Sequence, residues 1–151
     1  MRVPTVFWLP EKISPGIIDE IGSAMDLFHT FSNLAGVAIP KDRILDSYDL
    51  GPSLFNNQKS SRDFLFYYRG TQLYAVRFGD FKAHFVTQGE YGQFGEKIIH
   101  DPPLLYNLNH DPSEKYNISD KHPDILEKIE ALVNEHKDKM ILGKDLLRKR
   151  G

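Results

Sequence analysis

Hydrophobic and polar residues alternate most regularly along residues 73–88, LYAVRFGDFKAHFVTQ. Two alternating runs flank Gly79 and Asp80, and glycine in such a pair tolerates the backbone angles of a tight hairpin turn. The pattern predicts a β-hairpin with five opposed pairs: Phe78 with Phe81, Arg77 with Lys82, Val76 with Ala83, Ala75 with His84 and Tyr74 with Phe85. The face predicted to join the core holds Tyr74, Val76, Phe78, Phe81, Ala83 and Phe85.

The opposite face of this hairpin carries Arg77, Lys82 and His84 around Ala75. Like charges directly across a strand pair are destabilising, so Arg77 opposite Lys82 requires solvent or an anionic neighbour. One interpretation is a solvated face with carboxylates supplied by another part of the chain. The other is a cationic surface beside a site for an anionic substrate, and the pattern leaves both open.

Two further strands and a helix are predicted around the hairpin. Aromatic residues at 64–68 favour a strand that turns through residues 69–72 into the hairpin, giving an antiparallel meander. Residues 104–108 predict a fourth strand that begins after Pro102 and Pro103, because proline cannot donate to a ladder. Pro123 opens the clearest helical pattern, with one stripe toward the sheet: Ile125, Ile129, Leu132, Val133 and His136.

The N-terminal third of the chain predicts a strand and a helix. Residues 3–9 are almost continuously apolar, which indicates a buried strand or an extended segment at a sheet edge. Ser23 and Asp26 resemble a capping box, so Asp26, with His29 and Thr30, is interpreted as the polar start of a helix. Its apolar face would hold Leu27, Phe28, Phe31, Leu34 and Ala35. A short helical turn is expected at residues 53–56. The predicted fold class is α+β: a small antiparallel four-stranded sheet packed by a C-terminal helix and preceded by a strand and a helix.

Composition narrows the classes of function. A chain of 151 residues with 40% hydrophobic and 26% charged residues suits a globular protein with a real core. Its net charge of −2 gives no electrostatic argument for a nucleic-acid partner. No apolar run approaches the roughly 20 residues that span a bilayer, so no membrane span is expected.

No self-contained active site emerges from the residue types. The chain has no cysteine, no G-x-S-x-G and no H-E-x-x-H, and its histidines lack metal-ligand spacing. We therefore predict no catalytic residue, no metal ligand and no cofactor within this chain.

Several ordered segments nevertheless resemble one family. They are PTVFWLP, MDLFHTFSNLAGVAIP, DSYDLGPSLF, LFYYRG, YAVRFGDFKAHFVTQG and PPLLYNLNHDPSEKYNI. In this order and spacing they resemble the C-terminal portion of the sulfatase family, of the arylsulfatase A and N-acetylgalactosamine-6-sulfatase type. The likeness covers almost the whole chain and is weakest at residues 89–97 and after residue 137.

The resemblance implies a longer parent protein, a sulfuric ester hydrolase with an alkaline-phosphatase-like domain before this region. Residues 1–45 would be the tail end of that large domain, and residues 46–151 the C-terminal sheet and helix subdomain. The parent would use Ca²⁺ and a formylglycine, neither of which this chain supplies, and would be periplasmic, secreted or lysosomal. Candidate substrate-binding residues are His84, Lys82 and Arg77, with Lys82 equally suited to joining the two domains.

The leading hypothesis is therefore a C-terminal sulfatase fragment that is inactive alone and contributes to the fold and rim of the cleft for an aryl sulfate or sulfated sugar. The alternative is a non-catalytic binding module for an anionic carbohydrate. Under the first hypothesis the partner is a missing N-terminal catalytic domain. Apolar surface left exposed would then favour self-association through residues 3–9 or the first helix.

Overall fold

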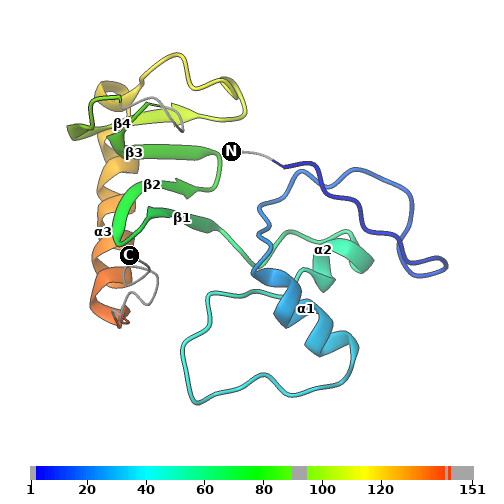
Figure 1. Ribbon diagram of the computed structural model, residues 1–151. Helices are drawn as coiled ribbons and strands as arrows, with labels where there is room; N and C mark the ends of the chain where they lie inside the picture. The colour runs from blue at the N-terminus through cyan, green and yellow to red at the C-terminus, as the bar shows by residue number, and fades with distance from the viewer. Residues whose placement is uncertain (1–2, 90–94, 142, 144–151) are drawn as a thin grey trace. The chain divides into compact units, whose positions relative to one another are not determined.

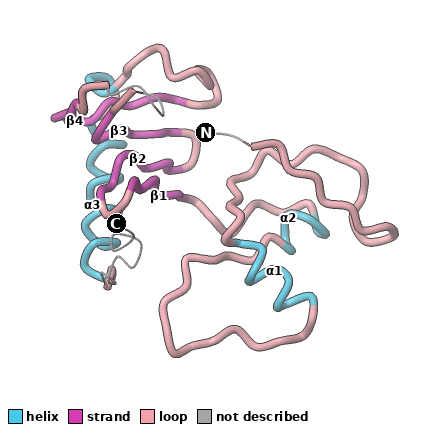
Figure 2. Tube along the Cα trace, in the orientation of Figure 1, coloured by secondary structure: helices cyan, strands magenta, loops and turns pink. Residues whose placement is uncertain are grey.

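The computed structural model describes residues 3–89, 95–141 and 143 of the chain. It forms two compact units, residues 1–65 (unit 1) and residues 66–151 (unit 2). The described part of unit 1 is mostly loop with two short helices, whereas unit 2 holds most of the sheet and the long helix (Figures 1 and 2). The helices and strands are α1 (Asp26–Leu34), α2 (Gly51–Asn56), β1 (Phe64–Arg69), β2 (Gln72–Phe78), β3 (Phe81–Thr87), β4 (Ile98–Asn107), the 3-10 helix η1 (Ser119–Lys121) and α3 (Pro123–Lys139).

The predicted antiparallel hairpin is confirmed as β2 and β3. Four of the predicted pairs are present: Ala75 with His84, Val76 with Ala83, Arg77 with Lys82 and Phe78 with Phe81. Gly79 occupies the turn with φ of 53°, a left-handed conformation that side chains rarely adopt. The sheet order is β1-β2-β3-β4, so the predicted three-stranded meander is confirmed, and the fourth strand of the predicted sheet lies beside β3.

Strand β4 begins six residues earlier than predicted, at Ile98, and runs through both prolines to Asn107. The pairing explains how this is possible. His84 pairs with Leu104 and Val86 with Ile99, and the register shifts between those two residues of β3. Pro102 and Pro103 fall in this shift, where their missing N–H groups cost no ladder bond.

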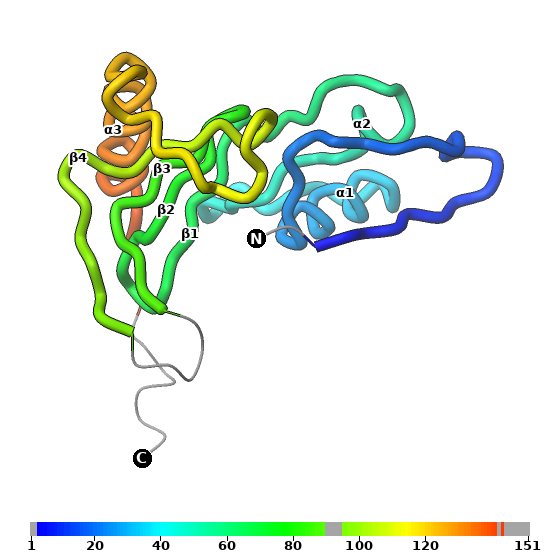
Figure 3. The backbone as a smooth tube through the Cα atoms, turned by 90° about the horizontal axis from the view of Figure 1, so that it is seen from above, coloured from blue at the N-terminus to red at the C-terminus, as the bar shows by residue number. Residues whose placement is uncertain are grey.

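Helix α3 covers the apolar face of the sheet, as predicted. In Figure 3 it lies along one side of the strands. The core consists of Val76, Ala83, Leu105, Leu126, Ile129 and Val133, with Phe66, Leu73, Phe78, Phe81, Phe85, Ile118, Ile125 and Leu132 packed against it. His136, at the end of the predicted stripe, stacks on Phe66 with ring centroids 3.9 Å apart. Leu126 joins this core although the predicted stripe omitted it.

The N-terminal part of unit 1 differs from the prediction. Among the described residues no strand precedes α1, and Val6 and Trp8 are 89% and 83% exposed. A strand requires a paired neighbouring strand, and the sheet of the described residues, β1-β2-β3-β4, does not include residues 3–9. The assignment of residues 1–45 to a larger domain and of residues 46–151 to a subdomain stays a prediction, since the compact unit observed here extends to Leu65.

Helix α1 exists as predicted, but the face that it buries is the opposite one. Phe28, Phe31 and Leu34 are each at least half exposed, whereas Asp26 and Thr30 are fully buried. The interpretation of Asp26 as an ordinary polar helix start is therefore incomplete. Of the predicted capping box only one half is present: the Asp26 carboxylate accepts a 2.8 Å hydrogen bond from the Ser23 N–H, whereas α1 has Met25 at its N-cap and no side-chain cap.

Candidate functional site

The two cations of β3 share one carboxylate from a distant loop. Glu114 lies between β4 and η1, and its Oε1 accepts a hydrogen bond from Lys82 Nζ at 2.7 Å. Its Oε2 lies 2.5 Å from His84 Nε2. Lys82 Nζ also lies 5.2 Å from the centroid of the Tyr67 ring, and His84 meets the edge of the Tyr106 ring. We call Lys82, His84 and Glu114 the β3 triad.

Burial and charge set the protonation of this triad. Burial alone would raise the pKa of Glu114, but the hydrogen bonds and charges of Lys82 and His84 outweigh it and hold the pKa below its usual value. Burial, followed by the charge of Lys82, lowers the pKa of His84 despite the opposing effect of Glu114. Near neutral pH, Glu114 is therefore an ionised carboxylate and His84 a neutral imidazole, and Lys82 is ion-paired with that carboxylate.

The predicted cationic face is largely neutralised. Lys82 has a side chain only 8% exposed and paired with Glu114, so the expectation of a solvated face is wrong for this residue. Carboxylates supplied by another part of the chain were one predicted solution, and Glu114 is such a carboxylate. Arg77 donates from Nε to the carbonyl oxygen of Gly79 at 3.1 Å and is half-buried. His84, with 19% of its side chain exposed, is the triad's accessible ring.

The sequence did not predict Glu114 as a site residue, because nothing in its loop indicates which side chains its carboxylate contacts. The loop around Glu114 is held by hydrogen bonds within itself: Asp111 Oδ2 accepts from the N–H groups of Lys115 and Tyr116. Glu114 itself has φ of 55°. The only available clue was the pair of cations on β3, which requires an anion from somewhere in the fold.

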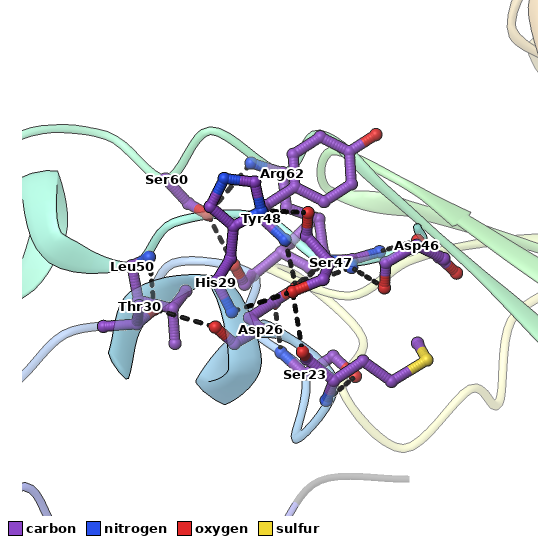
Figure 4. A network of polar contacts seen from close by, with 12 residues as sticks. Ser23, Asp26, His29, Thr30, Asp46, Ser47, Tyr48, Leu50, Ser60 and Arg62 are labelled. Carbon is purple, nitrogen blue, oxygen red and sulfur yellow. Dashed lines mark hydrogen bonds and ion pairs between the residues drawn. The ribbon is translucent and has the colours of Figure 1, made fainter. Parts of the chain in front are cut away.

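A second polar cluster lies entirely within unit 1 and is centred on Arg62 (Figure 4). Arg62 and Asp26 both have fully buried side chains and form an ion pair of 2.6 Å. The same guanidinium donates to Asp46 Oδ1 at 3.1 Å and to the Phe64 carbonyl oxygen at 3.3 Å. It lies 4.5 Å from the centroid of the Tyr48 ring.

The Arg62 cluster also explains why a polar face of α1 is buried. Asp26 accepts from Tyr48 N at 2.9 Å in addition to Arg62, and Thr30 Oγ1 accepts from Leu50 N at 2.9 Å. Both oxygens of Asp26 are therefore occupied by protein donors, so Asp26 holds α1 and the following loop together and has no oxygen open to a ligand. His29 contacts Ser47 through its Nδ1 and its backbone N–H.

The part of the chain that the structure describes contains no group of three His, Cys, Asp or Glu side chains able to hold a metal ion. Within the same residues, no helix has the length and apolar character required to cross a bilayer.

Comparison with known proteins identifies the family of this chain. The profile of the family described as the C-terminal region of aryl-sulfatase matches residues 60–151, which include the sheet, the β3 triad and α3. The chain belongs to this sulfatase family. It is 34% identical to N-acetylgalactosamine-6-sulfatase of Canis lupus familiaris over 97% of its own length and 32% of that protein. It is 36% identical to human arylsulfatase A over 87% of its length and 30% of that protein.

Solved structures support the fold. A Bacteroides thetaiotaomicron protein, described within a genetic locus for the metabolism of multiple glycosaminoglycans, matches with a TM-score of 0.66 and 24% identity, covering 85% of this chain and 28% of that one. The PsFucS1 sulfatase from Pseudoalteromonas sp. matches with a TM-score of 0.61 and 23% identity, covering 78% and 27%. The chain thus corresponds to a C-terminal part of sulfatases and spans about a third of the length of its curated relatives.

Proposed function

We propose that this chain is the C-terminal part of an enzyme that hydrolyses sulfate esters, and that its sheet contributes to the rim of the substrate cleft. Family membership over residues 60–151 is the observation that carries the proposal. The names of the relatives point to an aryl sulfate or a sulfated sugar as the substrate class.

The nucleophile and the metal ligands would lie in the two thirds of the relatives' length that this chain does not match. The chain has no cysteine and no S-x-P-x-R motif whose serine could become a formylglycine, and its described residues offer no cluster of metal ligands. The Ca²⁺ and formylglycine chemistry implied for the parent enzyme is therefore assigned to a separate, N-terminal catalytic domain. That domain is the proposed partner of the chain.

Within the chain, His84 is the proposed substrate contact. Of the three predicted candidates it has the accessible ring in the β3 triad, whereas Lys82 is buried against Glu114. Lys82 is better suited to holding the strand and the loop together, because its charge is already compensated. Arg77 is a weaker candidate, since its Nε is committed to the turn at Gly79.

An activity assay tests this proposal. The 151-residue chain alone should show no turnover of an aryl sulfate with added Ca²⁺, whereas the full-length gene product that contains it should be active. In the full-length protein, His84→Ala should lower kcat/KM, and His110→Ala, in an exposed loop, should leave it unchanged. Turnover by the isolated chain, or a full-length product inactive on sulfate esters, would refute the proposal.

A further inference from the structure

The loop that carries Glu114 presents its carboxylate to β3 in a fixed direction. The Glu114 N–H donates to the Asp111 carbonyl oxygen at 3.1 Å, and Asp111 Oδ2 anchors the two following N–H groups. The carboxylate then has one oxygen on Lys82 and the other on His84. Each oxygen therefore has a distinct partner, and rotation of the carboxylate would break both contacts.

This arrangement determines which nitrogen of His84 carries the proton. Glu114 is ionised and can only accept hydrogen bonds, so a contact with His84 Nε2 requires a proton on Nε2. The imidazole is neutral, because burial and the charge of Lys82 lower its pKa. A neutral imidazole has one proton, and Nδ1 must therefore carry the lone pair.

Nδ1 is left open for a ligand. Among the residues that the structure describes, His84 Nδ1 has no hydrogen-bond partner. The buried side-chain atom that lacks a partner there is Ser53 Oγ, so Nδ1 is accessible to solvent. The ring is held in place by the edge of Tyr106, with centroids 5.7 Å apart. The result is a fixed, solvent-facing hydrogen-bond acceptor on the face where the sequence predicted a cation.

We propose that Glu114 is a positioning residue that fixes His84 as the Nε2–H tautomer, and that His84 Nδ1 accepts a hydrogen bond from a neutral donor of the substrate, such as a sugar hydroxyl. Under this proposal His84 does not bind the sulfate group, because a neutral acceptor has no attraction for an anion. The choice of a sugar rests on the proposed function, whereas the tautomer does not.

Nitrogen-15 NMR of the histidine rings in the 151-residue chain tests the positioning role. The wild type at neutral pH should show His84 as the Nε2–H tautomer. In Glu114→Gln the side-chain oxygen can still accept from Lys82 while its NH₂ group faces Nε2, so the tautomer should shift toward Nδ1–H. Glu135→Gln, which alters an exposed pair with Lys139 on α3, is the matched control and should change nothing at His84.

The outcomes decide the positioning role directly. A protonated imidazolium or an Nδ1–H tautomer in the wild type would overturn it, and this measurement needs no variant to fold. An unchanged tautomer in a folded Glu114→Gln chain would overturn it as well.

Titration of the same chain with a neutral sugar and with sulfate tests which of the two binds at His84 Nδ1. N-acetylgalactosamine should move the His84 Nδ1 resonance, and sodium sulfate at matched ionic strength should not. Movement with sulfate alone, or with neither probe, would overturn the assignment of a neutral donor. In the full-length protein, Glu114→Gln should lower kcat/KM by roughly two- to tenfold, the range of one neutral hydrogen bond. If the wild-type full-length protein is an active sulfatase and Glu114→Gln keeps its full kcat/KM, only the inference on Glu114 is contradicted. If the wild-type protein is inactive on sulfate esters, the proposed function is contradicted.

Discussion

At the scale of single residues, each buried charged side chain of the described part of the chain has an oppositely charged partner. Arg62 and Asp26 have no exposed side-chain surface, and each is satisfied by several hydrogen bonds. Burial alone would lower the pKa of Arg62, but the hydrogen bond and charge of Asp26 outweigh it and raise the pKa. A buried guanidinium of this kind is costly to desolvate, so removal of either partner leaves an uncompensated charge.

Replacement of Arg62 by methionine should therefore destabilise unit 1 strongly. We expect the free energy of unfolding to fall by about 3–5 kcal/mol, the usual effect of leaving one buried partner unpaired. Urea denaturation of the chain measures this loss. Arg43→Met, at an exposed pair with Asp42, is the control and should have little effect. Equal stability of the two variants would contradict the assigned role of Arg62.

The β3 triad predicts how stability depends on pH. The groups that face His84 are Lys82 on the same strand, Glu114 in the loop, and His100 and Tyr106 on β4. The pKa of His84 is lower in the folded chain than the value of about 6.5 expected after unfolding. As the pH falls through that value, the unfolded chain takes up a proton that the folded chain does not, so stability decreases.

Thermal melts between about pH 7.5 and pH 5 should accordingly show Tm falling from about pH 6.5 downward. The lowered pKa of Glu114 adds a further loss below its unfolded value of about 4.3. His84→Gln should reduce the first decline, because its side chain does not titrate. His110→Gln, in an exposed loop, should retain it. A Tm that rises on acidification would contradict the neutral state of His84.

At the scale of elements, the hairpin of β2 and β3 determines the layout of unit 2. Its turn fixes the register of the two strands, and its apolar face packs against α3. On its other face, Lys82 and His84 contact the carboxylate of Glu114. Period-two alternation and a two-residue turn are local properties, so this element was predictable in detail. Strand β4 was less predictable, because its register shift depends on pairing with β3.

Gly79→Ala tests the turn. The position has φ of 53° and open space around it, so an added methyl group meets no neighbour and only the backbone is strained. We expect a loss of about 1 kcal/mol in the free energy of unfolding, the usual cost of a left-handed conformation for a residue with Cβ. Gly16→Ala, also in open space but without a positive φ, should change stability little. An unchanged free energy of unfolding in Gly79→Ala would contradict the left-handed conformation assigned to Gly79.

At the scale of the whole molecule, apolar surface is concentrated in unit 1. Most of the large exposed hydrophobic residues lie there, including Val6, Trp8, Phe28 and Phe31. Helix α1 contributes to this surface because its buried side is occupied by the Arg62 cluster. Apolar exposure of this extent is typical of an interaction surface. In the proposed parent enzyme, the catalytic domain would cover it.

The isolated chain should therefore self-associate through unit 1. Light scattering is expected to give an average mass that rises with protein concentration above the 17.4 kDa monomer. The double variant Phe28→Ser and Phe31→Ser should reduce this rise, because both rings are at least half exposed on α1. Tyr116→Ser, an exposed aromatic residue of unit 2, is the control. A monomer at every concentration would contradict the prediction.

The sequence by itself determined the elements that depend on near neighbours in the chain: the hairpin register, most of the apolar stripe of α3, and the presence of α1 and α2. It also supplied the family, through segments that keep their order and spacing. Only the tertiary structure decided the partners of the charged residues. Arg62 meets Asp26 across 36 positions, and Lys82 meets Glu114 across 32. Such pairings follow from how distant elements pack and from the cost of burying unpaired charge, and neither property has a local signature in the sequence.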